Sequence, residues 1–146
     1  AWSVIGKPPI VYVNGSFQNT NVYGAYTIDG KFHYKFVAKQ LATKTIRFLE
    51  RLRKIYQKII FIIDRATWHT AKIVQKYFKK HAATLRVEYF PITSPDLNPV
   101  EECWRQTRKN VTNNTEFNET KKLKKELTKE WKKQPFKHKI INYLIP

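Results

Sequence analysis

Short segments rich in β-branched and aromatic residues, separated by turn signals, fill the first forty positions of the chain. The segments are Ile10–Val13, Asn21–Ile28 and Phe32–Ala38. The last of them alternates aromatic with mostly polar positions, as a half-buried strand does. Asn14-Gly15 and Asp29-Gly30 follow the first two segments, and dipeptides of this kind favour tight hairpin turns. The pattern predicts three antiparallel strands joined by short turns.

The spacing of apolar residues becomes helical after position 42. Thr43–Tyr56 places apolar residues along one face of an amphipathic helix, and Ile73–His81 repeats that spacing. Ile59–Ile63 is instead an unbroken apolar run, which is typical of a strand covered on both faces. Leu85–Phe90 predicts one more short strand. Because strands alternate with helices, we expect an α/β fold in which helices flank both faces of a mixed sheet.

The last third of the chain predicts two helices and a tail. Pro99 to about Val111 repeats apolar residues at helical spacing, and Glu116–Lys133 does so among many lysines. Gln134-Pro135 should end the second helix, because the residue before a proline disfavours helical backbone. The tail Phe136–Pro146 is apolar enough that we expect it to pack back onto the domain. We find no linker, so we expect residues 1–146 to form one domain, with 112–146 as its basic helical extension.

The charge of the chain limits its partners. Among 146 residues, 28 are Lys or Arg and 11 are Asp or Glu, which gives a formal net charge of +17. Such a surplus favours a polyanion, most simply nucleic acid. No apolar run approaches the roughly 20 residues that a membrane span needs, so we expect no membrane partner. The lone Cys103 cannot form an internal disulfide, and a reducing cytosol or nucleus fits.

The start of the sequence predicts a longer protein. The chain contains no methionine, even at its first position, and Ala1–Pro9 reads like the interior of a domain. Removal of an initiator methionine is the other explanation. We expect a portion of a longer chain.

Two carboxylates stand at the ends of predicted elements. Asp64 directly follows Ile59–Ile63, and ligands bind at the carboxyl ends of strands in open α/β sheets. Glu101 falls in the first turn of the helix that Asn98 would cap. Each carboxylate also has a structural interpretation, since Asp64 could cap the next helix and Glu101 could complete a capping box. Glu102 is the rival of Glu101, because neighbouring helix residues point about 100° apart.

In so basic a chain, a divalent metal shared by Asp64 and Glu101 would act on a phosphodiester. These two residues are therefore the catalytic and metal-ligand candidates. His69 is a possible accessory residue, and a capping or core histidine is an equal alternative. Trp68 and Trp104 could stack on bases, although Trp104 fits a helix core better. The DNA-binding candidates are the basic residues of the last third: Arg105, Arg108, Lys109, Lys121, Lys122, Lys124 and Lys125.

Two motifs resemble the catalytic core of mariner-type transposases, and the resemblance is closest to the bacterial and archaeal insertion-sequence branch. The motifs are Ile62-Ile63-Asp64-Arg65-Ala66 with His69, and Ser94-Pro95-Asp96-Leu97-Asn98-Pro99-Val100-Glu101 with Trp104. The likeness covers most of the chain and weakens after about Asn113. Arg65 departs from the asparagine that is often found after the family's aspartate.

The resemblance implies a ribonuclease H-like fold and an Asp–Asp–Glu triad that binds two Mg²⁺ ions, with Mn²⁺ as a possible substitute. Asp64 matches the second member of the triad, and Glu101 matches the third. The first aspartate would lie upstream of Ala1, on a central strand. The chain would therefore be a partial DDE catalytic domain that lacks its first strand, and we expect little or no metal-dependent cleavage by it alone.

The implied activity of a complete domain is DNA strand cleavage and strand transfer in transposition, with transposon ends and target DNA as partners. The full-length protein could form a homodimer, and we expect a cytoplasmic, nucleoid-associated prokaryotic protein. Two alternatives come from other classes. One is a catalytically inactive DNA-binding transposase remnant, and the other is a ribonuclease H-like nuclease.

Overall fold

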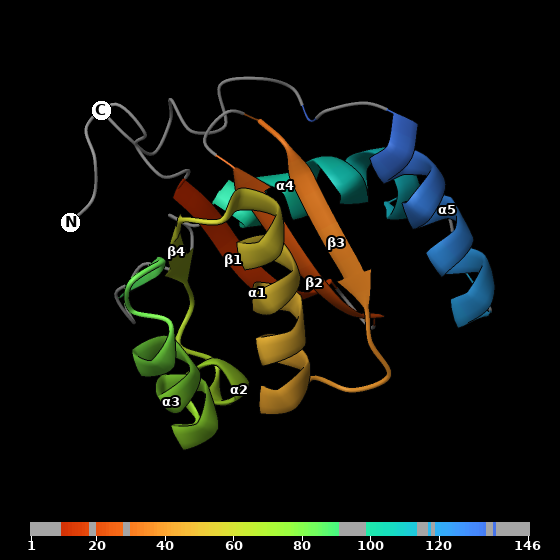
Figure 1. The fold of residues 1–146 in the computed structure, drawn as a ribbon. Coiled ribbons are helices and arrows are strands. Elements are labelled where there is room, and N and C mark those ends of the chain that lie inside the picture. Colours follow the sequence, from red (N-terminus) through yellow and green to blue (C-terminus); the bar gives the residue numbers. More distant parts are fainter. Residues whose placement is uncertain are drawn as a thin grey trace.

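The structure, a computed structural model, describes residues 10–17, 20–27, 30–90, 99–113, 117, 119–133 and 136. Five strands form one sheet in the order β3-β2-β1-β4-β5 (Figure 1). The strands are β1 (Ile10–Phe17), β2 (Thr20–Thr27), β3 (Phe32–Phe36), β4 (Ile59–Ile63) and β5 (Leu85–Tyr89). The helices are α1 (Ala42–Tyr56), α2 (Thr67–Thr70), α3 (Lys72–Lys80), α4 (Pro99–Thr107) and α5 (Thr120–Lys133). The predicted α/β class with a mixed, helix-flanked sheet is confirmed.

The central strand β1 joins the antiparallel and the parallel part of the sheet. It pairs antiparallel with β2 and parallel with β4, where Val13 lies opposite Ile63. We expected a sheet without its first strand, and this part of the prediction is corrected because Ile10–Phe17 occupies the central position. Both edges of the strand are thereby hydrogen-bonded, which leaves no gap in the ladder.

The turn predicted at Asn14-Gly15 is wrong. Asn14 and Gly15 lie within β1, opposite Gly24 and Tyr23 of β2, and the register shifts between Gly15 and Phe17. The pairing of Phe17 with Thr20 puts the hairpin connection further along, so sheet pairing overrides the local turn preference. The second predicted turn is supported at Gly30, which has a φ of 94° and donates its N–H to the carbonyl of Thr27.

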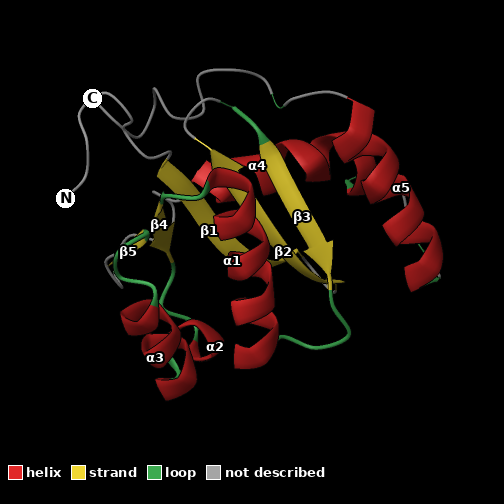
Figure 2. Ribbon diagram, viewed as in Figure 1, coloured by secondary structure: helices red, strands yellow, loops and turns green. Residues whose placement is uncertain are grey.

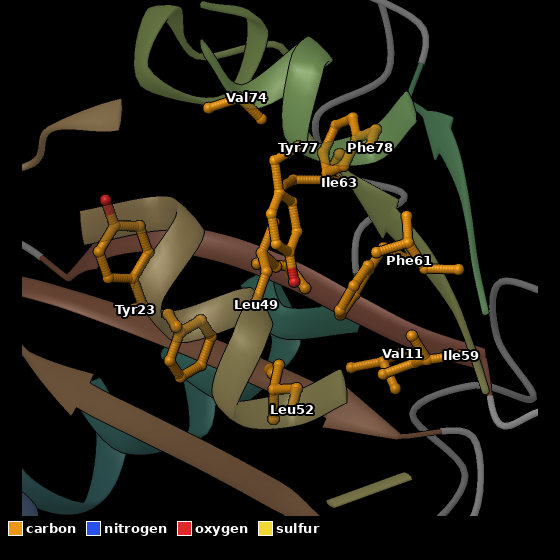
Figure 3. Close-up of a cluster of buried hydrophobic side chains, with 14 residues drawn as sticks. Val11, Tyr23, Leu49, Leu52, Ile59, Phe61, Ile63, Val74, Tyr77 and Phe78 are labelled. Carbon is orange, nitrogen blue, oxygen red and sulfur yellow. The ribbon is translucent and has the colours of Figure 1, made fainter. Parts of the chain in front are cut away.

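One face of the sheet packs against α1, α2 and α3 (Figure 2). Alternate residues of the strands point into this layer, as strand geometry requires, and meet the apolar stripes of α1 and α3. Figure 3 shows Val11, Phe61 and Ile63 of the sheet together with Leu49 of α1 and Phe78 of α3. This cluster fixes the start of α2, and with it the chain that leaves the end of β4.

The other face of the sheet packs against α4 and α5. Val100, Cys103 and Trp104 of α4 are buried there, which confirms that Trp104 is a core residue. Gly24 of β2 lets α4 approach closely, because a Cβ atom at this position would lie 2.5 Å from Trp104 Cη2. Burial raises the pKa of the Cys103 thiol.

The basic C-terminal helix begins later than predicted. α4 continues into a π-helical turn, Arg108–Thr112, and α5 starts at Thr120, after Glu119 accepts the hydrogen bond of Leu123 N. Phe136 packs edge-on against Phe32, at 4.9 Å between ring centroids, whereas the rest of the predicted tail lies outside the described residues. No helix in the described part of the chain is long and apolar enough to cross a membrane.

Candidate functional site

The end of β4 is the place where the chain brings polar groups to one edge of the sheet. Asp64 follows Ile63, the last strand residue, and its side chain is 31% exposed. Because β1 and β4 are parallel, their carboxyl ends meet at the same edge. The predicted position of Asp64 at a strand end is therefore what the structure has.

The Asp64 carboxylate is held through one of its oxygens. Oδ1 accepts hydrogen bonds from Ala66 N at 2.9 Å and from His69 Nδ1 at 2.7 Å. Within the described residues Oδ2 has no hydrogen-bond partner, so it remains available to a ligand. The residue before α2 is Ala66, and no side chain caps this helix. The alternative interpretation of Asp64 or Thr67 as its side-chain cap is therefore wrong.

His69 is fully buried and lies between the sheet and the helical layer. An ionised carboxylate can only accept hydrogen bonds, so Nδ1 carries the proton in the bond to Asp64. His69 Nε2 is buried and has no partner among the described residues. Among the described residues, the hydrogen bond of the His69 ring is therefore the one to Asp64.

The backbone of His69 is held by a second chain of hydrogen bonds. Tyr89 Oη, at the end of β5, donates to the His69 carbonyl at 3.0 Å, and Gln75 Nε2 of α3 donates to Tyr89 Oη at 2.6 Å. Burial raises the pKa of Tyr89, which keeps this phenol a donor. Arg65 Nε donates to Phe90 O at 3.2 Å, with its guanidinium carbon 5.3 Å from the centre of the Tyr89 ring. Sequence reasoning missed Tyr89 and Gln75, because no local motif marks them.

The central strand β1, which lies on one side of β4, supplies no carboxylate. Asn14 and Asp64 are the residues that follow the paired Val13 and Ile63, so they occupy neighbouring positions on strands about 4.8 Å apart. The sequence of β1, IVYVNGSF, contains no acidic residue. In the part of the chain that the structure describes, no three His, Cys, Asp or Glu side chains come together as a metal site.

The start of α4 lies over β2 at the same level of the sheet. Val100 Cγ1 is 3.2 Å from the position that a Cβ of Gly24 would take, and Gly24 pairs with Asn14. Glu101 is the next residue and is half-buried. Since Gly24 and Asp64 are two strand spacings apart, the start of α4 falls within roughly 10 Å laterally of Asp64. A shared position for the Asp64 and Glu101 carboxylates stays a prediction.

Glu102 is engaged elsewhere. It pairs with Arg105 on the outer side of α4 and accepts a hydrogen bond from Gln106 Nε2 at 3.4 Å. The bond to the Arg105 guanidinium is the main cause that lowers the pKa of Glu102. Its carboxylate thus forms a surface ion pair. This agrees with the expectation that only one of Glu101 and Glu102 points towards the end of β4.

The basic candidates fall into two groups, one on α4 and the π-helical turn that follows it and one on α5. Arg105 and Lys109 are exposed, and Arg108 is half-buried. On α5, Leu127 and Trp131 face the core, and the lysines occupy the other sides, with Lys124 Nζ 5.6 Å from the centre of the Phe36 ring. Contact with DNA stays a prediction for all seven candidates.

Comparisons with known proteins agree with this architecture. A family model described as DDE superfamily endonuclease matches residues 1–124. The Tc3 transposase of a transposable element from Caenorhabditis elegans is 30% identical over 112 residues, which covers 70% of this chain and 33% of that protein. The Tcb2 transposase from Caenorhabditis briggsae is 29% identical over 101 residues, covering 69% of this chain and 36% of that protein. The chain spans about a third of the length of these curated relatives.

The catalytic domain of Mos1 mariner transposase superposes with a TM-score of 0.73 at 21% identity, over 92% of this chain and 76% of that one. Mos1 catalytic-domain structures include complexes of raltegravir with Mn and with Mg. At this identity the likeness shows a common fold, and it identifies the sheet order of the chain as that of a ribonuclease H-like domain.

Proposed function

The chain belongs to the DDE superfamily of endonucleases, and from this premise we propose that it is part of a transposase catalytic domain whose complete protein cleaves and transfers DNA strands. The predicted resemblance to mariner-type transposases is confirmed, while the finer assignment to the insertion-sequence branch stays a prediction. The observation that carries the proposal is the Asp64 carboxylate, fixed at the end of β4 with Oδ2 open to a ligand.

A divalent metal, Mg²⁺ or Mn²⁺, is the cofactor that this carboxylate suits, because both ions take carboxylate oxygens. Asp64 would hold it through Oδ2, and Glu101 is the proposed second ligand. The Mos1 catalytic domain, which has the same fold, has been solved with Mn and with Mg. Such a metal, when bound, activates an oxygen nucleophile and stabilises the leaving oxygen of a phosphodiester.

The protein's own residues would bind the DNA and orient the carboxylate that holds the metal. His69 and Ala66 N fix the rotation of the Asp64 carboxylate, which keeps Oδ2 at one position. The exposed Lys and Arg residues of α4 and α5 would neutralise backbone phosphates of transposon-end and target DNA. A homodimer of the complete protein is part of the same proposal. The expected prokaryotic, nucleoid-associated location stays a prediction, since the curated relatives named above come from nematodes.

A second candidate is a DNA-binding remnant without catalysis. It is favoured by Asn14, an amide in the position beside Asp64, and by the absence of an acidic residue from β1. Two carboxylates hold two metals poorly, so we propose that the chain of 146 residues binds DNA but cleaves it weakly or not at all. The domain boundaries, residues 1–146 with 112–146 as a basic extension, belong to the proposal as well.

A strand-transfer assay tests the proposed function. The complete protein that contains this chain is incubated with supercoiled plasmid and an end-labelled duplex in Mg²⁺ or Mn²⁺. Covalent joining of the label to the plasmid would support a transposase. Nicking without joining would indicate the nuclease alternative, and DNA binding without either product would indicate the remnant.

A further inference from the structure

A second basic surface lies apart from α4 and α5, in a groove between the edge strand β3 and helix α1. Its volume is about 410 Å³, and its rim consists of Lys35 on β3 and three basic residues on α1: Lys44, Arg47 and Arg51. The residues that line the groove include no Asp or Glu. The stretch 30–49 also lacks acidic residues, and Glu50, which follows it on α1, pairs with Arg53 and accepts a hydrogen bond from the Tyr77 hydroxyl.

The rim charges are available to a ligand. Lys35, Arg47 and Arg51 are exposed, and Lys44 is half-buried. In the described part of the chain none of the four forms an ion pair. Arg51 makes one weak contact, from Nη1 to the Tyr34 carbonyl at 3.4 Å. The groove thus combines unpaired positive charges with apolar lining residues, Phe36, Val37 and Phe48. Such a narrow basic groove is suited to an extended anionic chain rather than to a compact acidic protein surface.

The groove opens at the same edge of the sheet as Asp64. β3 is antiparallel to β2, and Phe36 pairs with Val22, so β3 ends at the edge where β1 and β4 end. α1 begins at this edge too, because Thr45 Oγ1 lies 2.8 Å from Tyr23 Oη. Tyr23 in turn lies beside His69, with 6.1 Å between the ring centroids. The end of β4, which Asp64 follows, and the end of β3 and start of α1, which flank the groove, therefore lie along one edge of the sheet. Figure 1 shows how these three elements are arranged.

The spacing on α1 fits a nucleic-acid backbone. Lys44, Arg47 and Arg51 follow one another at i, i+3 and i+7 and therefore share a helix face. With a rise of 1.5 Å per residue they span about 10 Å, which corresponds to about three phosphates along one DNA strand.

We propose that the groove between β3 and α1 binds the phosphate backbone of duplex DNA and holds it along the edge of the sheet that carries Asp64. This proposal rests on the proposed function in taking DNA as the ligand. It adds a binding surface formed by Lys35, Lys44, Arg47 and Arg51, separate from the basic residues of α4 and α5.

Charge-matched triple variants test the proposal. The groove variant combines Lys35→Gln, Lys44→Gln and Arg47→Gln. The control combines Lys58→Gln, Lys79→Gln and Lys80→Gln, which remove the same charge from exposed positions at the amino ends of β4 and β5, on the opposite edge. Fluorescence anisotropy with a labelled duplex of arbitrary sequence, from about 50 to 200 mM salt, gives Kd and its salt slope.

The groove variant should weaken binding at least about 10-fold at 100 mM salt and reduce the slope of log Kd against log salt by about 2 to 3, since each phosphate contact contributes about 0.9. The control should change the slope by less than about 1. Equal losses of DNA affinity in the two variants, with thermal melts showing that both are folded, would contradict DNA binding in the groove. That result would leave the proposed function standing. Failure of the parent chain to bind DNA at all would overturn both.

A cross-linking measurement adds an independent readout. Cys103 is buried, so a cysteine placed on the surface is the reactive one. Ala38→Cys places a photo-cross-linker in the groove, and Ala83→Cys places it in the exposed turn before β5. Cross-links to duplex DNA should form from position 38 and not from position 83. The reverse pattern would contradict the proposed location.

Discussion

His69 Nδ1 lies 2.7 Å from Asp64 Oδ1, and this contact joins a fully buried imidazole to the carboxylate at the end of β4. The bond occupies one carboxylate oxygen and leaves the other free. The histidine five residues after the aspartate can make this bond because of the local backbone. Ala66 is extended, and the short helix α2 that follows it places the His69 ring next to Asp64. The imidazole therefore acts as a positioning group.

Substitution of His69 tests this positioning role. His69→Asn keeps a donor near the place of Nδ1, whereas His69→Gln carries its amide too far out. Asp64 Oδ1 keeps Ala66 N as a donor, so losing the bond from His69 costs about 0.5–1.5 kcal/mol, and His69→Gln should lower thermal stability more than His69→Asn.

The two His69 variants should also differ in Mn²⁺ affinity. His69→Asn should retain most of the parent's affinity in calorimetric titration, because Asp64 stays oriented. If both variants bound Mn²⁺ like the parent, His69 would be a core residue without a positioning role.

An acidic residue at position 14, beside Asp64, should increase the affinity for a divalent metal. Asn14→Asp would add a carboxylate on the neighbouring strand, about 4.8 Å away in the sheet. Without metal, the two like charges should lower the melting temperature. With Mn²⁺ at ten times its Kd, binding should restore about 1.4 kcal/mol of stability. Thermal melts with and without Mn²⁺ measure this, and Asn113→Asp, an exposed site on the end of the π-helical turn, is the control. An equal Mn²⁺ response in both variants would contradict the account.

Gly24 should tolerate no side chain. An added Cβ would meet Trp104 Cη2 at 2.5 Å and Val100 Cγ1 at 3.2 Å. Gly24→Ala must therefore push α4 away from the sheet, and overpacking of this kind typically costs about 1–3 kcal/mol. Urea unfolding measures the loss. Gly30→Ala serves as a comparison, since a Cβ there has space but a φ of 94° strains it. A stability of Gly24→Ala equal to the parent's would show that α4 packs less closely.

The Arg53–Glu50 ion pair within α1, to which Tyr77 of α3 adds a hydrogen bond, predicts a pH dependence of stability. Arg53 and the Tyr77 hydroxyl both donate to Glu50, and the Arg53 bond is the main cause that lowers the pKa of Glu50 from 4.5 to about 2. A depressed carboxylate pKa stabilises the fold above pH 4.5, and this contribution disappears as the pH falls towards 2. Glu50→Gln should therefore be less stable than the parent at pH 7 and equal to it near pH 2. A constant stability difference across this range would contradict the assignment.

The helices and strands were easier to predict from the sequence than the pairing of the strands. The unbroken run Ile59–Ile63 and the helical stripe of Thr43–Tyr56 indicate a strand and a helix because their periodicity comes from burial alone. The central place of Ile10–Phe17 was not predictable, since Asn14-Gly15 is a strong local turn signal that long-range pairing on both edges overrides.

The candidate site was predictable only where its residues are close together in the sequence. Asp64 at the end of an apolar run is visible in the sequence, and the nearby His69 follows from the motif. The support by Gln75 and Tyr89 was not visible, because these residues contact one another only after β5 and α3 pack together.

The most direct test of the central claim is metal-dependent DNA cleavage by the complete protein carrying Asp64→Ala, Glu101→Ala or Glu102→Ala. Glu101 and Glu102 are adjacent in sequence and chemically identical, so the pair is its own control. The account predicts that Asp64→Ala and Glu101→Ala reduce Mg²⁺-dependent nicking of plasmid to the metal-free background, while Glu102→Ala remains close to the parent. Full activity of Asp64→Ala, or loss of activity in Glu102→Ala with retention in Glu101→Ala, would contradict it.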